Sequence, residues 1–129
     1  MIDNIEYKEE LPSEIAVLIG KVLKRTELVT ANEDSLMFYT EEGETYKMYH
    51  AQNCCEGVYI EDLIGNLKDL LGAPILTAIE KTNIDSATSS TGTWTFYEIA
   101  TKKGFVQIRW HGVSNGYYSE DIDFIKVDN

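Results

Sequence analysis

The stretch from Trp94 to Val127, "WTFYEIATKKGFVQIRWHGVSNGYYSEDIDFIKV", decides the predicted fold of the chain. It contains three runs rich in aromatic and β-branched residues, and such runs favour β-strands. Lys102-Lys103-Gly104 separates the first two runs, and Val113-Ser114-Asn115-Gly116 separates the last two. Because an Asn-Gly pair is a strong hairpin signal, we expect three consecutive antiparallel strands, the last two joined at Asn115-Gly116.

Alternation along these strands predicts which side chains share a face, because successive residues of a strand point to opposite sides. We expect Val106, Ile108 and Trp110 to face the core, together with Trp94 and Phe96. The opposite, solvated face is expected to carry Thr95, Tyr97, Gln107, Arg109, His111, Tyr117, Ser119 and Asp121. Glu120 falls on the apolar side, so it should lie at the sheet margin or be buried with a dedicated partner, for which Arg109 is a candidate.

Turn residues divide the rest of the chain into short elements. We expect short helices at residues 12–20 and 66–72, each stopped by a glycine. Strands are expected at residues 21–30, at 35–50 as a hairpin around Gly43, at 58–62 and at 74–82. Residues 1–11 should form a loose arm, and residues 83–93, rich in Ser and Thr, a mobile loop. The sequence therefore predicts a single α+β domain over residues 1–129, a mostly antiparallel sheet of six to seven strands with two short helices.

The chain is strongly acidic, with 22 Asp and Glu against 11 Lys and Arg and a net charge of −11. Its Lys and Arg residues are scattered singly or in pairs, whereas binding to a phosphate backbone requires a cluster of them. We therefore expect no direct binding to nucleic acid. The acidic surface either keeps the protein soluble or presents carboxylates to a partner that normally binds phosphates. The second interpretation predicts a basic host protein as the partner.

The segment from His50 to Asp62, "HAQNCCEGVYIED", concentrates residues that could carry chemistry. Adjacent thiols rarely chelate one zinc ion, no second Cys or His pair has zinc-ligand spacing, and the calcium-loop pattern is absent, so we expect no metal and no cofactor. His50 could serve as a base for Cys54, but no cysteine-hydrolase signature is present. We expect no catalytic residue. A polar loop with one buried cysteine, and an enzyme that uses Cys54 or the Glu61/Asp62 acids, stay open as alternatives.

Cys54 and Cys55 also bear on the location of the protein. A disulfide between neighbouring residues closes a strained ring, so we expect both thiols to be reduced, as is usual in the cytoplasm. Residues 1–20 lack the basic start and apolar core of a signal peptide, and no apolar run approaches the ~18 residues of a membrane span. These observations predict a cytoplasmic protein without membrane contact.

Two blocks, "YKMYHAQNCCEGVYIEDLIGNLKDLLGAPIL" and "TWTFYEIATKKGFVQIRWHGVSNGYYSEDIDF", resemble a family of small uncharacterised domains found in bacteria and their phages. The similarity covers roughly Ile15 to Phe124. The family has no established activity to transfer, but the resemblance implies a bacterial host cell and a pocket formed by its recurrent polar positions. Asn53, where Asp is expected, and His111, where Tyr is more usual, depart from the pattern.

These positions predict one binding site made by the loop from His50 to Asp62 and the hairpin from Arg109 to Glu120. The expected ligand-binding residues are His50, Gln52, Cys54, Glu56, Glu61, Asp62, Arg109, Asn115, Tyr117, Tyr118, Ser119 and Glu120. Because Arg and Tyr supply charge and planar rings for stacking, we expect a nucleotide-like small molecule as the ligand.

Three functions are compatible with this site. The leading hypothesis is a non-enzymatic binding protein of phage or mobile-element type that acts in counter-defence by sequestering the nucleotide-like ligand. The alternative is an acidic inhibitor that blocks a nucleic-acid-binding host factor, in the manner of anti-CRISPR proteins. The third is a small enzyme that uses Cys54 or the Glu61/Asp62 acids. Each hypothesis leaves a homo-oligomer open.

Overall fold

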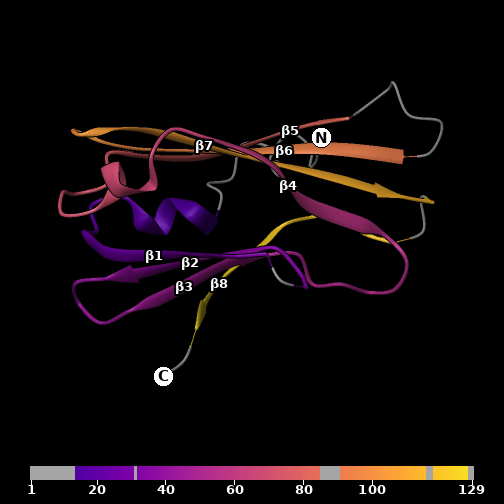
Figure 1. Cartoon of the computed structure of the whole chain (residues 1–129), viewed down its shortest axis with the longest axis horizontal. Helices are drawn as coiled ribbons and strands as arrows, with labels where there is room; N and C mark the ends of the chain where they lie inside the picture. Colours follow the sequence, from indigo (N-terminus) through magenta and orange to yellow (C-terminus); the bar gives the residue numbers. More distant parts are fainter. Residues whose placement is uncertain (1–13, 31, 85–90, 116–117, 128–129) are drawn as a thin grey trace, which may run out of the picture.

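The computed structural model of the chain describes residues 14–30, 32–84, 91–115 and 118–127. In these residues, eight strands form two antiparallel four-stranded sheets, which Figure 1 shows as two layers. The first sheet has the order β1 (Leu23–Val29), β2 (Ser35–Thr40), β3 (Thr45–Tyr49) and β8 (Asp123–Val127). The second has the order β4 (Gly57–Ile64), β7 (Gly104–Ser114), β6 (Thr91–Thr101) and β5 (Thr77–Ile84).

The predicted α+β class needs a correction, although the mostly antiparallel sheet is confirmed. The two expected helices are single 3₁₀ turns, η1 (Glu14–Leu18) and η2 (Leu67–Leu70), and eight strands replace the expected six to seven. Gly20 and Gly72 follow these turns with φ of 89° and 79°, so both glycines take the predicted left-handed conformation. Segments this short form too few backbone hydrogen bonds to offset the cost of starting an α-helix. With eight strands and no α-helix among the described residues, the protein is mostly β.

The core lies between the two sheets. Phe38 and Met48 fill it from the first sheet, and Ile108 and Trp110 fill it from the second. The indole N–H of Trp110 lies 3.3 Å from Sδ of Met48, so the one polar group of this large side chain has a partner across the layers. The predicted inward face of β7, which includes Val106, is confirmed.

The predicted faces of β6 are wrong. Thr95 and Tyr97 are buried, whereas Trp94 and Phe96 lie on the outer side of the second sheet. The tight turn after Thr101 fixes the register, because it sets Thr95 opposite Trp110 and Tyr97 opposite Ile108. Burying the two larger rings would require a slip of one residue, which would also turn Tyr97 out of the core.

The predicted hairpin at Asn115-Gly116 is also wrong. Both edges of β7 are occupied, by β4 and β6, and β8 instead pairs with β3 in the opposite sheet. Phe124 stacks on Tyr46, with ring centroids 5.6 Å apart, and contacts Phe38 at 5.9 Å. The last strand therefore completes the first sheet, because Phe124 packs against the aromatic rings of β2 and β3. As a result, the chain crosses from the second sheet to the first after Ser114.

Two such crossovers position the candidate site. Residues 50–56 lead from β3 in the first sheet to β4 in the second, and residues 115–122 lead from β7 back to β8. Residues 1–13 and 85–90, which cover the expected loose arm and most of the expected mobile loop, lie outside the described residues. Within the described ranges, no helix has the length and apolar character needed to cross a membrane.

Candidate functional site

His50 and Glu56 form a buried pair at the first crossover. Nε2 of His50 lies 2.7 Å from Oε2 of Glu56, and Nδ1 lies 2.6 Å from the backbone carbonyl oxygen of Asp121. Both side chains are almost completely removed from solvent. Because a carbonyl and a carboxylate are both hydrogen-bond acceptors, both ring nitrogens of His50 are engaged in these contacts.

The surroundings of Glu56 favour its charged form. Burial raises the pKa of Glu56, but hydrogen bonds from His50 and from the backbone N–H groups of Cys54, Asn53 and Glu56 itself outweigh this effect and lower the pKa from 4.5 to about 2. The N–H groups of Asn53 and Cys54 lie 2.8 and 3.0 Å from the carboxylate. Glu56 thus holds its own loop in a tight bend around the carboxylate, which is a structural role.

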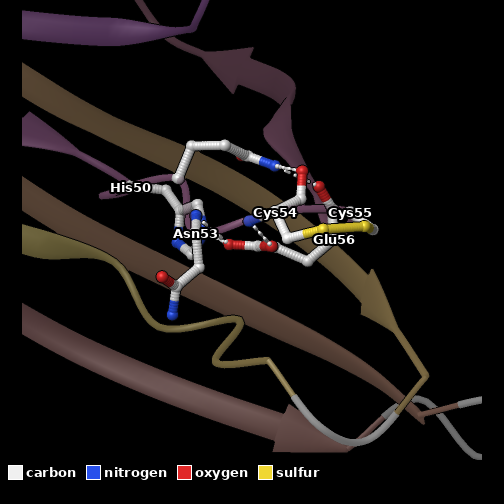
Figure 2. Close-up of a disulfide and its surroundings, with 6 residues drawn as sticks. His50, Asn53, Cys54, Cys55 and Glu56 are labelled. Atoms are coloured by element: carbon white, nitrogen blue, oxygen red, sulfur yellow. Dashed lines mark hydrogen bonds and ion pairs between the residues drawn. A yellow bond between two sulfur atoms is a disulfide. The ribbon is translucent and has the colours of Figure 1, made fainter.

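The two cysteines do not behave as expected. Figure 2 shows Cys54 and Cys55 joined by a disulfide above Glu56, and both residues are exposed. The expectation of reduced thiols, and of one buried cysteine, is therefore wrong. The bend that Glu56 imposes on the loop brings the neighbouring sulfur atoms together on its outer side. Gln52 closes the same loop, because its amide N–H₂ lies 2.7 Å from the carbonyl oxygen of Glu56 and 3.2 Å from that of Cys54.

Glu120 is buried at the second crossover with dedicated partners. Its carboxylate accepts hydrogen bonds of 2.7 Å each from the hydroxyls of Thr93 and Ser114. The suggestion that Arg109 is the partner is wrong, since Arg109 extends from the opposite face of β7. Gly112 permits the close approach of this segment, because a Cβ there would lie 2.9 Å from Cβ of Glu120.

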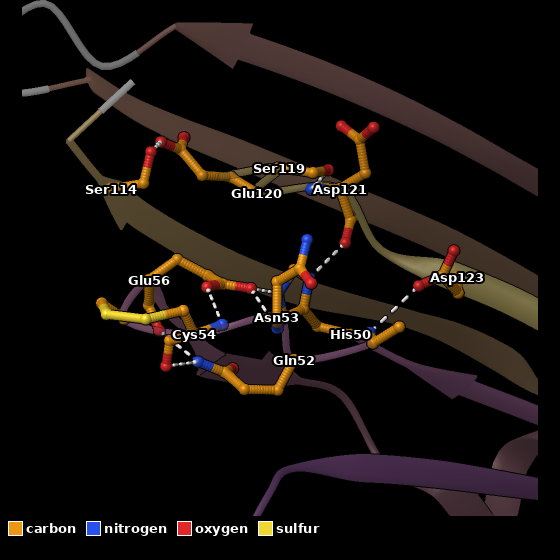
Figure 3. A network of polar contacts seen from close by, with 12 residues as sticks. His50, Gln52, Asn53, Cys54, Glu56, Ser114, Ser119, Glu120, Asp121 and Asp123 are labelled. Atoms are coloured by element: carbon orange, nitrogen blue, oxygen red, sulfur yellow. Dashed lines mark hydrogen bonds and ion pairs between the residues drawn. A yellow bond between two sulfur atoms is a disulfide. The ribbon is translucent and has the colours of Figure 1, made fainter. Parts of the chain in front are cut away.

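The two predicted segments do meet, as Figure 3 shows. Apart from the bond between His50 and the Asp121 carbonyl, the backbone N–H of Ala51 lies 3.0 Å from Oδ2 of Asp123. Ser119 stands beside this contact, and its hydroxyl accepts a 3.1 Å hydrogen bond from the backbone N–H of Asp121. These contacts fasten one crossover to the other and close this end of the sandwich.

A cavity of about 420 Å³ lies next to the network, and His50, Gln52 and Glu56 form part of its lining. Its remaining polar side chains include Glu33 and Asp34, and Tyr59 borders it. Oδ2 of Asp34 accepts a 2.7 Å hydrogen bond from the backbone N–H of Ile60. The cavity is therefore acidic, and its charge opposes a phosphate-bearing ligand.

Arg109 belongs to a different surface, the outer side of the second sheet. Its Nε lies 2.9 Å from Glu61, and its Nη2 lies 3.1 Å from Asp62. A bulge between Ile60 and Asp62 allows two consecutive acids of β4 to reach the same guanidinium. The structure thus brings Arg109, Glu61 and Asp62 together, but it separates them from His50, Glu56 and Glu120.

Aromatic rings surround Arg109 on this surface. The Trp94 ring lies 4.2 Å from that of His111, 6.4 Å from that of Phe96 and 5.8 Å from the Arg109 guanidinium carbon. The Tyr59 ring meets His111 edge-on at 5.8 Å, and the Tyr59 hydroxyl lies 3.4 Å from its Nδ1. We call Tyr59, Trp94, Phe96, Arg109 and His111 the aromatic face. Of these five residues, the sequence predicted only Arg109 as a site residue. The tight turn at Lys102-Lys103 carries the register that places Trp94 and Phe96 on this side of the sheet.

Three more predicted site residues lie at the end of β7 and in the connection that follows it. Asn115 is exposed at the end of β7, Tyr118 is half-buried, and Tyr117 lies outside the described residues. Within the ranges that the structure describes, no group of three or more His, Cys, Asp or Glu side chains is arranged to hold a metal ion.

Comparison with known proteins identifies a family relationship. A family model described as "Domain of unknown function (DUF7448)" matches residues 16–124. This match confirms the expected relation to an uncharacterised domain family over nearly the same range. No curated protein and no solved structure matches the chain.

Proposed function

Because this chain belongs to the DUF7448 family of domains of unknown function, we propose from its own geometry that it is a non-enzymatic binding domain, and that its aromatic face docks onto a basic surface of a protein partner. The observation that carries the proposal is the cluster of three aromatic side chains around a histidine and an arginine on the outer side of a sheet. Trp, Tyr and Arg are the residues that most often dominate binding energy in protein interfaces.

Charge complementarity supports a basic partner. Two acids, Glu61 and Asp62, already hold Arg109, and Glu98 holds Lys81 at 3.5 Å on the same side of the sheet. Three carboxylates thus accompany two cations around the rings, in a chain of net charge −11. Such a surface attracts a basic protein and accelerates its association at low salt.

The leading expectation from sequence was a nucleotide-like ligand. The rings of the aromatic face favour such a ligand, but the carboxylates beside them oppose it. A base could stack on Trp94, but a phosphate would approach Glu61 and Asp62 as well as Arg109. The acidic cavity beside His50 is no better suited to a phosphate. A nucleotide is therefore the second candidate ligand, and its binding is tested separately below.

The groups expected for catalysis are engaged elsewhere. Cys54 is bonded to Cys55 and so carries no thiolate, while Glu61 and Asp62 are both paired with Arg109. This favours binding over chemistry. If the partner normally binds nucleic acid, docking of this acidic face would block its phosphate-binding surface. Such blockade would suit the counter-defence role proposed for a chain of bacterial or phage type.

The test places a photo-crosslinking amino acid at Tyr59, in the aromatic face, or at Tyr39, on the outer side of the first sheet. Tyr39 is a matched control because it also carries an arginine, with the Arg25 guanidinium carbon 3.8 Å above its ring. In bacterial cells, we expect position 59 to crosslink a protein other than a second copy of this chain, and we expect position 39 not to crosslink that protein. Equal crosslinking from both positions would contradict the proposal.

The crosslinked protein is then purified and titrated against the chain. Trp94→Ala together with Arg109→Ala should weaken binding at least about tenfold, as expected for hot-spot residues. The control pair, Lys47→Ala with Tyr49→Ala, removes a cation and the ring 4.4 Å from it on β3, in the first sheet, and should leave affinity unchanged. ATP, GTP and cyclic nucleotides form the second arm: a rise in melting temperature that Trp94→Ala abolishes, without any crosslinked protein, would replace the proposed partner by a nucleotide.

A further inference from the structure

β1 is an edge strand with an open side. Among the described residues it pairs within its sheet with β2 alone, and only its first residue, Leu23, has a further backbone contact, a 2.9 Å hydrogen bond from Gly72 to its carbonyl oxygen. Leu28 and Val29 are 44% and 36% exposed on this strand. A groove of about 640 Å³ runs beside β1 and is lined by Thr26 and Leu28 on one side and by Leu63 and Leu67 on the other. The residues that the structure describes therefore leave this edge accessible to another strand.

The other three edge strands, β4, β5 and β8, are less suited to pairing with a strand of another molecule. At β4, the Asp34 carboxylate already takes the N–H of Ile60, and a bulge follows. The remaining edges, β5 and β8, can be judged by their sequences. A symmetric antiparallel pair places one central residue opposite its own copy, and in β5 the two central choices are Glu80 and Lys81, which would each face a like charge. In β8, pairing about Ile125 would bring no acid opposite a base.

β1 has a self-complementary charge pattern. If two copies pair about Thr26, Arg25 of each copy lies directly opposite Glu27 of the other, and the two Thr26 side chains face each other. Opposite charges and threonines are both favourable cross-strand neighbours. Arg25 and Glu27 lie on the outer side with Tyr39, whose hydroxyl donates a 3.1 Å hydrogen bond to Glu27. Thr26 lies on the inner side, opposite Phe38 in the neighbouring strand.

We propose that the chain forms a homodimer in which β1 pairs antiparallel with β1 of a second copy about Thr26, so that the two first sheets become one continuous eight-stranded sheet. This arrangement pairs the open edge and partly covers Leu28 from solvent. The net charge of −11 on each copy opposes association at long range. Salt at physiological strength screens that repulsion beyond about 8 Å, whereas the Arg25–Glu27 contacts are much shorter.

A dimer joined through β1 would affect recognition whichever ligand the aromatic face binds. The two-fold axis of such a dimer stands perpendicular to the joined sheet, so both second sheets lie on the same side of it. The two aromatic faces would then point in the same direction, and a partner with two matching sites could bind both at once.

Sedimentation equilibrium in 0.15 M salt, about physiological strength, tests the dimer and its register together. Arg25→Glu and Glu27→Arg each create two like-charge pairs, so each should weaken dimerisation about tenfold or more. The double variant R25E/E27R restores opposite charges and should recover most of the affinity. Lys81→Glu, an equal charge change on the other sheet, is the control and should have no effect. Circular dichroism confirms that each variant folds.

A covalent test checks the register independently. In the proposed pair, the Cβ atoms of the two Thr26 residues lie about 5 Å apart, so Thr26→Cys should form an intermolecular disulfide on mild oxidation. Leu28→Cys, whose copies would be several residues out of register, should not. A wild-type chain that stays monomeric at high micromolar concentration overturns the proposal. A dimer that ignores both single charge reversals, or whose double swap fails to recover, overturns it equally.

Discussion

Replacing Gly65 by alanine should destabilise the protein far more than the same change at Gly43. Gly65 follows β4 with φ of 101°, and a Cβ there would lie 2.3 Å from the backbone carbonyl oxygen of Phe105. Gly43, in the turn between β2 and β3, has nearly the same φ, 93°, but no atom lies within 4 Å of its Cβ position. The pair therefore separates the cost of the left-handed conformation from the cost of the collision.

The left-handed conformation costs an alanine about 1–2 kcal/mol at either position. At Gly65 the Phe105 backbone must also move, which adds about 1–3 kcal/mol, as overpacking of a well-packed site does. Gly65→Ala should therefore lower the free energy of unfolding by about 2–5 kcal/mol and Gly43→Ala by about 1–2 kcal/mol. Urea unfolding followed by circular dichroism measures both, and the melting temperatures should differ by roughly 3–12 °C. Losses within about 0.5 kcal/mol of each other would refute the close approach of β4 and β7 at Gly65.

Substitutions at the two crossovers and in the core should change the stability of the protein in predictable ways. Because the pKa of Glu56 is lowered from 4.5 to about 2 in the folded protein, its contribution to stability is complete above pH 4.5 and is lost as pH falls toward 2, so Glu56→Gln should flatten the acid side of a plot of unfolding free energy against pH. Gly112→Ala should cost about 1–3 kcal/mol by displacing Glu120, whereas Gly57→Ala, with open space at its Cβ position, should not collide with anything; denaturant titrations compare the two. Ile108→Ala should cost about 2–5 kcal/mol because Ile108 is fully buried, and calorimetry would contradict its core position if the loss were below 1 kcal/mol, the low end for a much smaller deletion.

The strands could be predicted from sequence, and so could the two pairings closed by tight turns, around Gly43 and across Lys102-Lys103-Gly104, which are confirmed. The partners of strands joined by longer connections could not. Alternation correctly put Val106, Ile108 and Trp110 in the core, because it reports on local geometry. It failed for Trp94 and Phe96, since period two gives two faces without saying which one is inward, and residue size was the wrong criterion. The Asn115-Gly116 pair failed for a different reason: it favours a turn, but the identity of the next strand's neighbour depends on which edges are already occupied.

The candidate site was also predicted only in part. His50 and Glu56 were expected to share one site with the hairpin from Arg109 to Glu120, and the structure joins His50 to the carbonyl of Asp121, one residue beyond that hairpin. Arg109 was expected in the same place, and the structure puts it on the opposite face of β7 with Glu61 and Asp62. Arg109 and Ser114 both belong to β7, but their side chains point to opposite faces of the second sheet. Residues that are close together in the sequence motif therefore lie on different surfaces.

The pairing of β3 with β8 also constrains how the chain folds. His50 and Asp121, which join the ends of these two strands, are 71 residues apart in the chain. During synthesis, β1, β2 and β3 leave the ribosome long before β8, so the outer edge of β3 and the ring of Tyr46 lack their final partners until β8 has been made. Long loop closure of this kind is slow. Deletion of β8 should therefore leave the edge of β3 unpaired and promote aggregation through it, which light scattering would detect.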